Sequence, residues 1–540
     1  MFALILTLGH NSSAILVEDG NILAGYEEER LSGEKSDSRF PINAIRKIIQ
    51  IYGNKLPDDI NICTSHWFLD GNLPDEDNKY WNRSILKEFF PEAKYYGLNI
   101  DEITHHHAHA LSAQVFAGEN FPKNYHILVM DGFGTEGECM TMYERRSDYT
   151  LKKTGYVYGF MQSLGLLYQY ATDFCKMKMH QHEYKMLAYE THITELISKE
   201  NIGIVNNRVD QWVNPFIRDC VSNSAKEVSL LPLELTHRLT DLLLLAYLAS
   251  MKQLCNIDVS DIRNVRILVA YFVQRTVEKV VGSIVMHHHP ENLLVVGGLF
   301  YNVKLNSLLC DMVPGKFCVM PLAGDQGAGL GVYQYHFGDL KWPGHLFWGT
   351  RDLRFDSSVK GMIKTYHHTR DLIADDLRAD KIVNLVRGSM EFGPRALCNT
   401  STFALPTLVN AEIINTMNDR TNEMPFALVV TEDQAKDLFE DIDKVHRSLE
   451  YMIVTRRFKK DKQTGLEGGA HYYPLQDLYT CRPQITNDPL MVSLLEEFGP
   501  LINTSFNYHG QPIVYDRESI ESAHRSESEY YPVTTIVEAT

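Results

Sequence analysis

The sequence of 540 residues predicts an α/β protein with a duplicated N-terminal core and a second α/β domain. An apolar run at residues 2–8 is followed by a polar turn and by two more runs that a hairpin signal joins, ending at residue 26. The same order returns at residues 126–143, around the polar turn 131–137. Two such units separated by helical segments indicate an internal duplication.

Helical periodicity dominates the sequence between residues 160 and 286. A short apolar run at residues 292–296 then predicts a strand, and Gly297, Gly298 and Asn302 follow it. A strand, a glycine turn and a helix in this order let the backbone approach a nucleotide closely. The pattern is weak by itself, because many tight turns share it.

Between Phe337 and Arg354 the chain is rich in Gly, Pro and Trp and loses its periodicity. A second α/β segment follows this stretch. We therefore predict two domains, which comprise residues 1–345 and 346–540.

The charge balance argues against a general affinity for polyanions. The chain has 52 basic and 69 acidic residues, which gives a net charge of -17. Such a charge keeps a protein soluble and opposes non-specific binding to nucleic acid or anionic membranes. A local basic groove remains compatible with this balance.

The cysteine pattern and the apolar runs predict a cytoplasmic location. Nine cysteines are scattered and none is spaced as CxxC, which is typical of reduced thiols. The apolar N-terminus lacks a basic region and a cleavage site, so we interpret it as a buried strand. The longest apolar helix candidate, at residues 242–251, is too short to span a bilayer.

His105 and His109 are four residues apart in an Ala-rich segment that we expect to be helical. At this spacing both imidazoles lie on one face and can bind one metal ion. We take Asp325, in the glycine-rich segment 324–331, as the third ligand. Two histidines and a carboxylate leave coordination positions open for phosphate oxygens or water. The alternative is that the histidines belong to a solvated helix end.

Two other segments combine charged or polar side chains with turns. Glu27–Arg30, with Lys35 close behind, is a charge run of the kind that is usually a solvated face. The turn that begins with Asp131, Gly132 and Gly134 offers backbone N–H groups to phosphates.

The second domain contains candidates for binding an oxyanion. Arg395 and Arg482 lie beside turn residues, where a guanidinium can bind an oxyanion with two hydrogen bonds. Asn503, Ser505 and Asn507 alternate along an expected strand and would share one face. That face suits an amide-like or phosphate ligand, whereas the alternative is an ordinary edge strand.

Several motifs, taken in order, resemble the O-carbamoyltransferases of the antibiotic and nodulation-factor type. The resemblance extends from the N-terminus to about Val514. The motifs are GHNSSA, EEER with Lys35, HHHAHA, MDGFG, SLGLLY, HEYKMLA, VVGGLFYN, GDQGAGLG, MEFGPRAL and INTSFNYHGQPI.

This resemblance implies an actin-like ATPase (ASKHA) domain followed by a YrdC-like domain. It implies that carbamoyl phosphate and ATP, with Mg²⁺, form carbamoyl-adenylate in the second domain. The first domain would then pass the carbamoyl group to a hydroxyl. The implied metal is iron or another transition metal, and its implied ligands are His105, His109 and Asp325.

The other implied roles concern the nucleotide and carbamoyl phosphate. The implied nucleotide contacts are Asp131, Gly132, Gly134, Gly297, Gly298 and Asn302, with Glu183 or Lys185. The residues implied to hold carbamoyl phosphate and the adenylate are Arg395, Arg482, Asn503 and Ser505, and Arg420 is a further basic position kept from the family pattern.

The transfer step also needs a group that accepts the proton of the acceptor hydroxyl. His10, in the first turn, is our candidate general base, and Lys35 is the candidate that stabilises the carbonyl oxyanion. Alternatively, His10 only forms hydrogen bonds within its turn.

The chain departs from the family pattern in the second domain. Cys398–Ser401 replaces Gly-Asn-Arg-Ser, two basic positions are lost between Asn418 and Phe426, and a His-x-Asp-Gly segment before Thr480 is missing. These losses leave open a second hypothesis, that the chain is a nucleotide-binding regulatory or scaffold protein that has lost activation.

The expected partners are small molecules, namely carbamoyl phosphate, ATP and a hydroxylated acceptor. The acceptor is a sugar, an antibiotic-type alcohol or a hydroxymethylated pyrimidine, and the net charge disfavours a nucleic acid. We expect its specificity to depend on residues 10–39 and 64–100. No membrane partner is expected, and a homodimer stays open.

Overall fold

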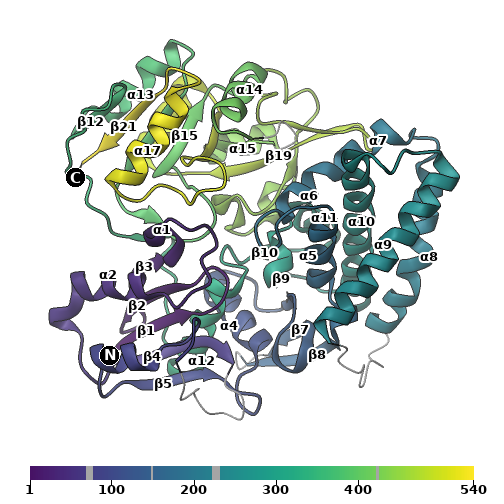
Figure 1. Cartoon of the computed structure of the whole chain (residues 1–540), viewed down its shortest axis with the longest axis horizontal. Helices are drawn as coiled ribbons and strands as arrows, with labels where there is room; N and C mark the ends of the chain where they lie inside the picture. Colours follow the sequence, from purple (N-terminus) through teal and green to yellow (C-terminus); the bar gives the residue numbers. More distant parts are fainter. Residues whose placement is uncertain (68–76, 147–149, 222–231, 421–424, 540) are drawn as a thin grey trace.

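A computed structural model describes residues 1–67, 77–146, 150–221, 232–420 and 425–539 of the chain (Figure 1). Residues 68–76, in the segment expected to select the acceptor, lie outside the described residues, as do residues 421–424. Among the helices of the described ranges, none is long and apolar enough to cross a bilayer. Eight of the nine cysteines have described side chains, and these eight are free thiols.

The first sheet contains five strands in the order β3-β2-β1-β4-β5. The first three strands form an antiparallel meander, and β4 and β5 continue the sheet in parallel with β1. The apolar runs of the sequence form these strands because the sheet is covered on both faces, so that successive side chains of a strand can all be buried. The strands are β1 (Phe2–Thr7), β2 (Ser13–Glu18), β3 (Asn21–Glu27), β4 (Asn61–Trp67) and β5 (Lys94–Leu98).

The second sheet repeats this topology. Read as β8-β7-β6-β9-β10, it again has an antiparallel meander followed by two parallel strands. The predicted duplication is therefore confirmed, as an actin-like domain requires. The strands are β6 (His126–Met130), β7 (Glu138–Arg145), β8 (Leu151–Tyr158), β9 (Leu293–Val296) and β10 (Phe317–Val319).

Two helices lie between the sheets and pack on each other. Helix α4 (His105–Ala117) contacts the second sheet, and α12 (Asp325–Phe337) contacts the first. Thr104 caps α4 by accepting a hydrogen bond from the N–H of His107 at 3.3 Å. Helix α12 ends at Phe337 and is followed by Gly338, which has the left-handed conformation common after helices.

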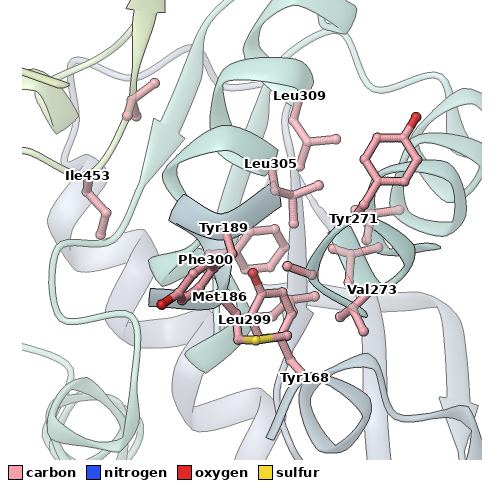
Figure 2. Close-up of a cluster of buried hydrophobic side chains, with 14 of the residues drawn as sticks. Tyr168, Met186, Tyr189, Tyr271, Val273, Leu299, Phe300, Leu305, Leu309 and Ile453 are labelled. Atoms are coloured by element: carbon pink, nitrogen blue, oxygen red, sulfur yellow. The ribbon is translucent and has the colours of Figure 1, made fainter. Parts of the chain in front are cut away.

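The helices between residues 164 and 312 surround the long buried helix α10 (Ile262–His288). Figure 2 shows part of one core cluster, in which Tyr168, Met186 and Phe300 lie close together, with Tyr271 on one side of them and Ile453 on the other. The helices and 3-10 turns here are α5 (Leu164–Phe174), α6 (Glu183–Tyr189), α7 (Ile193–Leu196), α8 (Ile202–Val221), α9 (Leu233–Cys255), η6 (Gly298–Tyr301) and α11 (Val303–Met312). The helical prediction for this region is confirmed.

The C-terminal part contains a nine-stranded mixed sheet, which confirms the predicted second α/β segment. Its strands follow the order β12-β21-β13-β15-β20-β16-β19-β17, and β18 pairs with β19. The strands are β12 (Met362–Thr365), β13 (Val383–Arg387), β15 (Thr400–Ala404), β16 (Ala427–Val430), β17 (Arg456–Arg457), β18 (His471–Tyr473), β19 (Leu478–Ile485), β20 (Leu501–Ser505) and β21 (Thr534–Glu538).

The helices around this sheet are α13 (Thr369–Arg378), α14 (Leu408–Met417), α15 (Glu432–Leu438), α16 (Pro489–Phe498) and α17 (Arg517–Ser528). The main hydrophobic core is continuous from the second sheet into this part, since one cluster of buried side chains includes Val295 in β9, Leu428 in β16 and Ile453. The two parts are thus packed together, while the boundary at residue 345 stays a prediction.

Candidate functional site

Four side chains converge where α4, α12 and the end of β6 meet. One ligand atom from each of His105, His109, Asp131 and Asp325 lies within 4.8 Å of the other three. The Nε2 atoms of the two imidazoles are 3.0 Å apart, and Asp131 Oδ2 lies 3.3 Å from His105 Nε2 and 3.2 Å from His109 Nε2. The three predicted ligands therefore meet, and Asp131 joins them.

The two histidines of this group are buried and the two aspartates are partly exposed, and the four charges influence one another strongly. Burial alone would lower the pKa of His105, but the carboxylates of Asp131 and Asp325 outweigh it and raise that pKa to about 10. Burial opposes ionisation of both acids, yet hydrogen bonds from the two histidines hold the pKa of each carboxyl below its usual value. The site thus favours two carboxylates beside positive charge.

The donor set fits a transition metal. Imidazole nitrogens and carboxylate oxygens are ligands that suit iron, zinc and similar ions, and here two of each face a common point. The third adjacent histidine, His106, is directed elsewhere, because its Nδ1 lies 2.8 Å from Thr141 Oγ1. The alternative interpretation, in which these histidines belong to a solvated helix end, is therefore wrong, since His105, His106 and His109 are all buried.

The glycines of the segment 324–331 allow close packing within the protein. A Cβ on Gly331 would lie 1.8 Å from the carbonyl oxygen of Ala108 in α4, and one on Gly329 would lie 2.6 Å from Ile5 in β1. Helix α12 can therefore approach α4 and β1 closely, which holds Asp325 opposite the two histidines. Protein atoms, not a bound group, occupy the space that these glycines leave.

The turns with the predicted nucleotide glycines meet at Asp131. Gly132 and Gly134 follow β6, and the N–H of Gly132 donates to Asp131 Oδ1 at 2.7 Å. Gly297 and Gly298 follow β9, and a Cβ on Gly298 would lie 3.0 Å from the same Oδ1 atom. Asn302 caps α11 by accepting a hydrogen bond from the N–H of Leu305 at 3.0 Å.

His10 lies at the mouth of this region. Its exposed ring stacks on His180, with ring centroids 4.9 Å apart. The carboxylate of Glu183 accepts a hydrogen bond from the N–H of His180 at 2.5 Å, and burial raises the pKa of Glu183. Glu183 thus fixes the loop that presents His180 to His10, and the sequence alone gave no reason to select His180.

The predicted arginines lie at a cavity of about 70 Å³ between the two parts of the chain. Arg395 and Arg482 line it from the C-terminal part, and Tyr301 and Lys304 line it from the N-terminal part. The buried Nε atoms of both arginines have no hydrogen-bond partner among the described residues. Burial, with Arg395 and Arg420 nearby, lowers the pKa of Arg482 to about 9. Such cations are well placed to bind an anion.

Arg420 belongs to the same cationic region. It donates a hydrogen bond to Thr504 Oγ1 at 3.0 Å, and its guanidinium lies over the ring of Phe426 at 4.7 Å from the centroid. Burial lowers its pKa to about 10.

Lys35 and Lys185 approach this region from the N-terminal part. Lys185 Nζ lies 3.2 Å from His509 Nε2, which belongs to the C-terminal part. Burial lowers the pKa of Lys35, and Arg420 and Arg395 are among the cations that lower it further. Lys35 thus lies within electrostatic range of Arg395 and Arg420.

The predicted polar strand has two kinds of residue. Asn503 is buried, and its amide donates to Gln484 Oε1 at 2.5 Å and to the carbonyl of Ala396, next to Arg395, at 3.3 Å. Ser505 is half-buried and donates to Asn507 Oδ1 at 2.5 Å. Its strand β20 lies inside the sheet between β15 and β16, so the edge-strand alternative is wrong.

The charge run Glu27–Arg30 is buried, so its interpretation as a solvated face is wrong. Glu28 accepts hydrogen bonds from Asn43 and from the N–H of Ala44 at 3.0 Å, which ties α1 (Glu28–Ser32) to α2 (Ile42–Tyr52). The physical reason is that each of these charges has a buried partner, a condition that charge patterning along the sequence does not reveal.

A larger cavity of about 480 Å³ lies among α5, α8, α9 and α10 and is mainly apolar. It includes Ser163, whose hydroxyl donates to the backbone carbonyl of Gly132 at 2.5 Å. None of the residues predicted for a site lines this cavity in the described part of the chain.

Comparison with known families gives two matches. The family model for the carbamoyltransferase N-terminus matches residues 77–333, and the model for the carbamoyltransferase C-terminus matches residues 374–537. Together they account for most of the chain.

Curated relatives agree with these matches. An uncharacterized protein of Methanocaldococcus jannaschii is 26% identical, over 95% of this chain and 95% of its own length. The nodulation protein NolNO of Sinorhizobium fredii is 24% identical, over 94% of this chain and 75% of its own. The 3'-hydroxymethylcephem-O-carbamoyltransferase of Amycolatopsis lactamdurans is 28% identical, over 41% of this chain and 44% of its own.

Among solved structures, HypF of T. kodakarensis matches with 14% identity and a TM-score of 0.29, over 62% of this chain and 47% of its own. Nothing further follows from so slight a likeness. The two family matches and the named relatives together show that the chain belongs to the carbamoyltransferase family and is a carbamoyltransferase.

Proposed function

We propose that the protein is an ATP-dependent O-carbamoyltransferase with two sites. The C-terminal part would form carbamoyl-adenylate beside Arg395 and Arg482, and the N-terminal part would transfer the carbamoyl group near His105, His109, Asp131 and Asp325. The cavity between the two parts is the observation that carries this proposal, because residues of both parts line it.

Tyr301 connects the two sites. Its ring lines the cavity that also contains Arg395, and its hydroxyl lies 3.4 Å from the side-chain oxygen of Gln326, the residue after Asp325. We propose that an adenylate formed at the arginines passes beside Tyr301 to the histidines without entering bulk water. Exclusion of water matters, because a mixed anhydride hydrolyses easily.

The balance of atoms fixes the order of the activation steps. Release of pyrophosphate requires an oxygen of free carbamate to attack the α-phosphorus of ATP, so water must first release phosphate from carbamoyl phosphate. Arg395, Arg420 and Arg482 would bind the phosphate groups, together with the Mg²⁺ that accompanies ATP. Lys35 and Lys185 would add positive charge from the N-terminal part.

In the transfer step the acceptor oxygen attacks the carbamoyl carbon, the bond to AMP breaks, and the acceptor proton moves to His10. Stacking on His180 orients the ring of His10 for this task. A metal ion bound by His105, His109, Asp131 and Asp325 would supply positive charge for the departing phosphate. Iron or a similar transition metal is our choice, from the donor set.

The acceptor is proposed to be a hydroxylated small molecule, such as a sugar or an antibiotic-type alcohol, or else a hydroxymethylated pyrimidine. One relative is named for a hydroxymethylcephem, which is consistent with a primary alcohol. The free thiols suit the cytoplasm as the place of action.

Two variants test the two-site proposal. Arg395→Ala should lower carbamoyl-phosphate-dependent pyrophosphate release by about 100-fold or more, since a charge-stabilising group is lost. His10→Ala should leave that release intact and lower carbamoyl transfer by about 100-fold. Pyrophosphate is measured directly, and transfer is measured by mass spectrometry on a panel of alcohols.

Arg354→Ala is the matched control, because Arg354 is exposed and pairs only with Asp352 among the described acids. Undiminished pyrophosphate release in Arg395→Ala would refute the activation site. A wild-type protein that binds ATP but never releases pyrophosphate would instead favour the regulatory or scaffold alternative.

A further inference from the structure

The short helix α1 and its N-cap residue Glu27 contact the C-terminal part of the chain. The side chains of Glu27 and Arg30 are 3% and 2% exposed and form an ion pair at 3.1 Å. Arg30 also pairs with Glu29 at 3.1 Å. Burying so many charges is costly unless each is paired. These charges therefore need partners, and some of the partners lie in the C-terminal part.

Both backbone polar groups of Gly393 are bound by this pair. Glu27 Oε2 accepts a hydrogen bond from the N–H of Gly393 at 3.0 Å, and Arg30 donates one to its carbonyl oxygen at 2.8 Å. Gly393 has a φ of 101°, and a Cβ there would lie 2.9 Å from Leu322. The position thus requires glycine, and the loop is held at this point from the N-terminal part.

The other end of the loop is held within the C-terminal part. Glu391 Oε1 accepts hydrogen bonds from the N–H groups of Leu397 at 2.8 Å and Asn399 at 2.9 Å. Arg395 lies between these two fixed points. Because its buried Nε has no partner among the described residues, its orientation depends on the backbone that carries it.

We propose that Glu27 and Arg30 are positioning residues that set the guanidinium of Arg395 in the activation cavity. This inference rests on the role proposed above for Arg395. It implies that the activation site is complete only when the N-terminal part is docked on it, so that the adenylate forms only where a closed route to the transfer site exists.

The test uses the full chain with the double substitution Glu27→Leu and Arg30→Met. The double substitution removes both hydrogen bonds to Gly393, and it also leaves Glu29 without its partner Arg30, so the fold of the variant is checked first by circular dichroism. Displacement of Arg395 should lower kcat for pyrophosphate release by about 10- to 100-fold. The KM for ATP should change little, since the lost interaction acts mainly in the transition state.

Hydrogen exchange supplies a readout that does not depend on activity. Amides of residues 390–397 should exchange faster in the double variant, whereas those of α2 should not change. Glu28→Gln is the matched control, because Glu28 is buried in the same helix but bonds to Asn43 and Ala44. It should retain the wild-type kcat and exchange.

Unchanged exchange at residues 390–397, or a wild-type kcat in the double variant, would overturn the inference. Should that variant fail to fold, Arg30→Lys replaces it, since a lysine keeps the charge but cannot reproduce the forked contacts. A wild-type protein without pyrophosphate release would count against the proposed function, and the exchange comparison would still decide whether this pair holds the loop.

Discussion

Asp131 completes the group of donors that His105, His109 and Asp325 begin. The family resemblance implied that Asp131 contacts the nucleotide, and the structure places its Oδ2 atom 3.3 Å and 3.2 Å from the Nε2 atoms of His105 and His109. Spacing within α4 predicts that two histidines share a face. No local pattern shows that a residue at the end of a strand will meet them.

The first prediction concerns metal content. His109→Ala should lower the amount of bound metal by at least about tenfold, because even residues that only support ligands typically have effects of that size. Elemental analysis of the purified protein measures this. His107→Ala is the control, since the His107 ring packs beside Tyr143 and Tyr335 and is not part of the donor group. Equal metal loss in both variants would contradict the assignment.

At the scale of elements, the site depends on how closely α4 and α12 pack. Each helix begins at a ligand, since His105 opens α4 and Asp325 opens α12. The Ala-rich run predicts α4, whereas residues 324–331 were identified only as a glycine-rich segment, and no helix was predicted there. The mutual approach of the two helices was not foreseeable, because it depends on a glycine that meets the backbone carbonyl of Ala108, a residue far away in the chain.

Gly331→Ala should therefore separate the two helices. The added Cβ would lie 1.8 Å from the carbonyl oxygen of Ala108, so the helices must shift, at a cost of at least about 1–3 kcal/mol in the free energy of unfolding. Urea denaturation measures this loss, and bound metal should fall with it. Gly203→Ala, in α8, meets no atom within 4 Å and should be neutral or stabilising. Full stability of Gly331→Ala would disprove the close packing.

At the scale of the whole molecule, a buried acid links stability to pH. Glu527 in α17 is fully buried, and Asn384 donates to it at 2.5 Å. Burial raises the pKa of Glu527 to about 8 despite this hydrogen bond. The carboxyl is therefore neutral in the folded protein over a range of pH where the unfolded chain ionises it.

Between its ordinary pKa of 4.5 and about 8, the unfolded chain binds fewer protons at Glu527, so the free energy of unfolding falls as pH rises. Above about pH 8 this contribution levels off. Glu527→Gln removes it, so the Tm of the variant minus that of the wild type should increase from pH 5 to pH 8. The exposed neighbour Glu518→Gln is the control. A difference that is constant with pH would contradict the raised pKa.

The relation between the two parts of the chain is also a property of the whole molecule. A cavity lined by Arg395 and Tyr301, the contact of Lys185 with His509, and the hydrogen bonds of Glu27 and Arg30 to Gly393 all join distant segments. The sequence alone selects most of these residues as site candidates, but its charge pattern led us to interpret Glu27 and Arg30 as part of a solvated face.

The sequence by itself determined the α/β class, the repeated strand order and the pairing of His105 with His109. Each of these follows from periodicity within a few turns or strands, where neighbours in the chain are neighbours in space. Only the tertiary structure decided that Asp131 faces the histidines and that an acid and a base near the N-terminus bind Gly393. Such meetings depend on how whole sheets and helices pack, and packing sums many contacts between distant residues that no local pattern encodes.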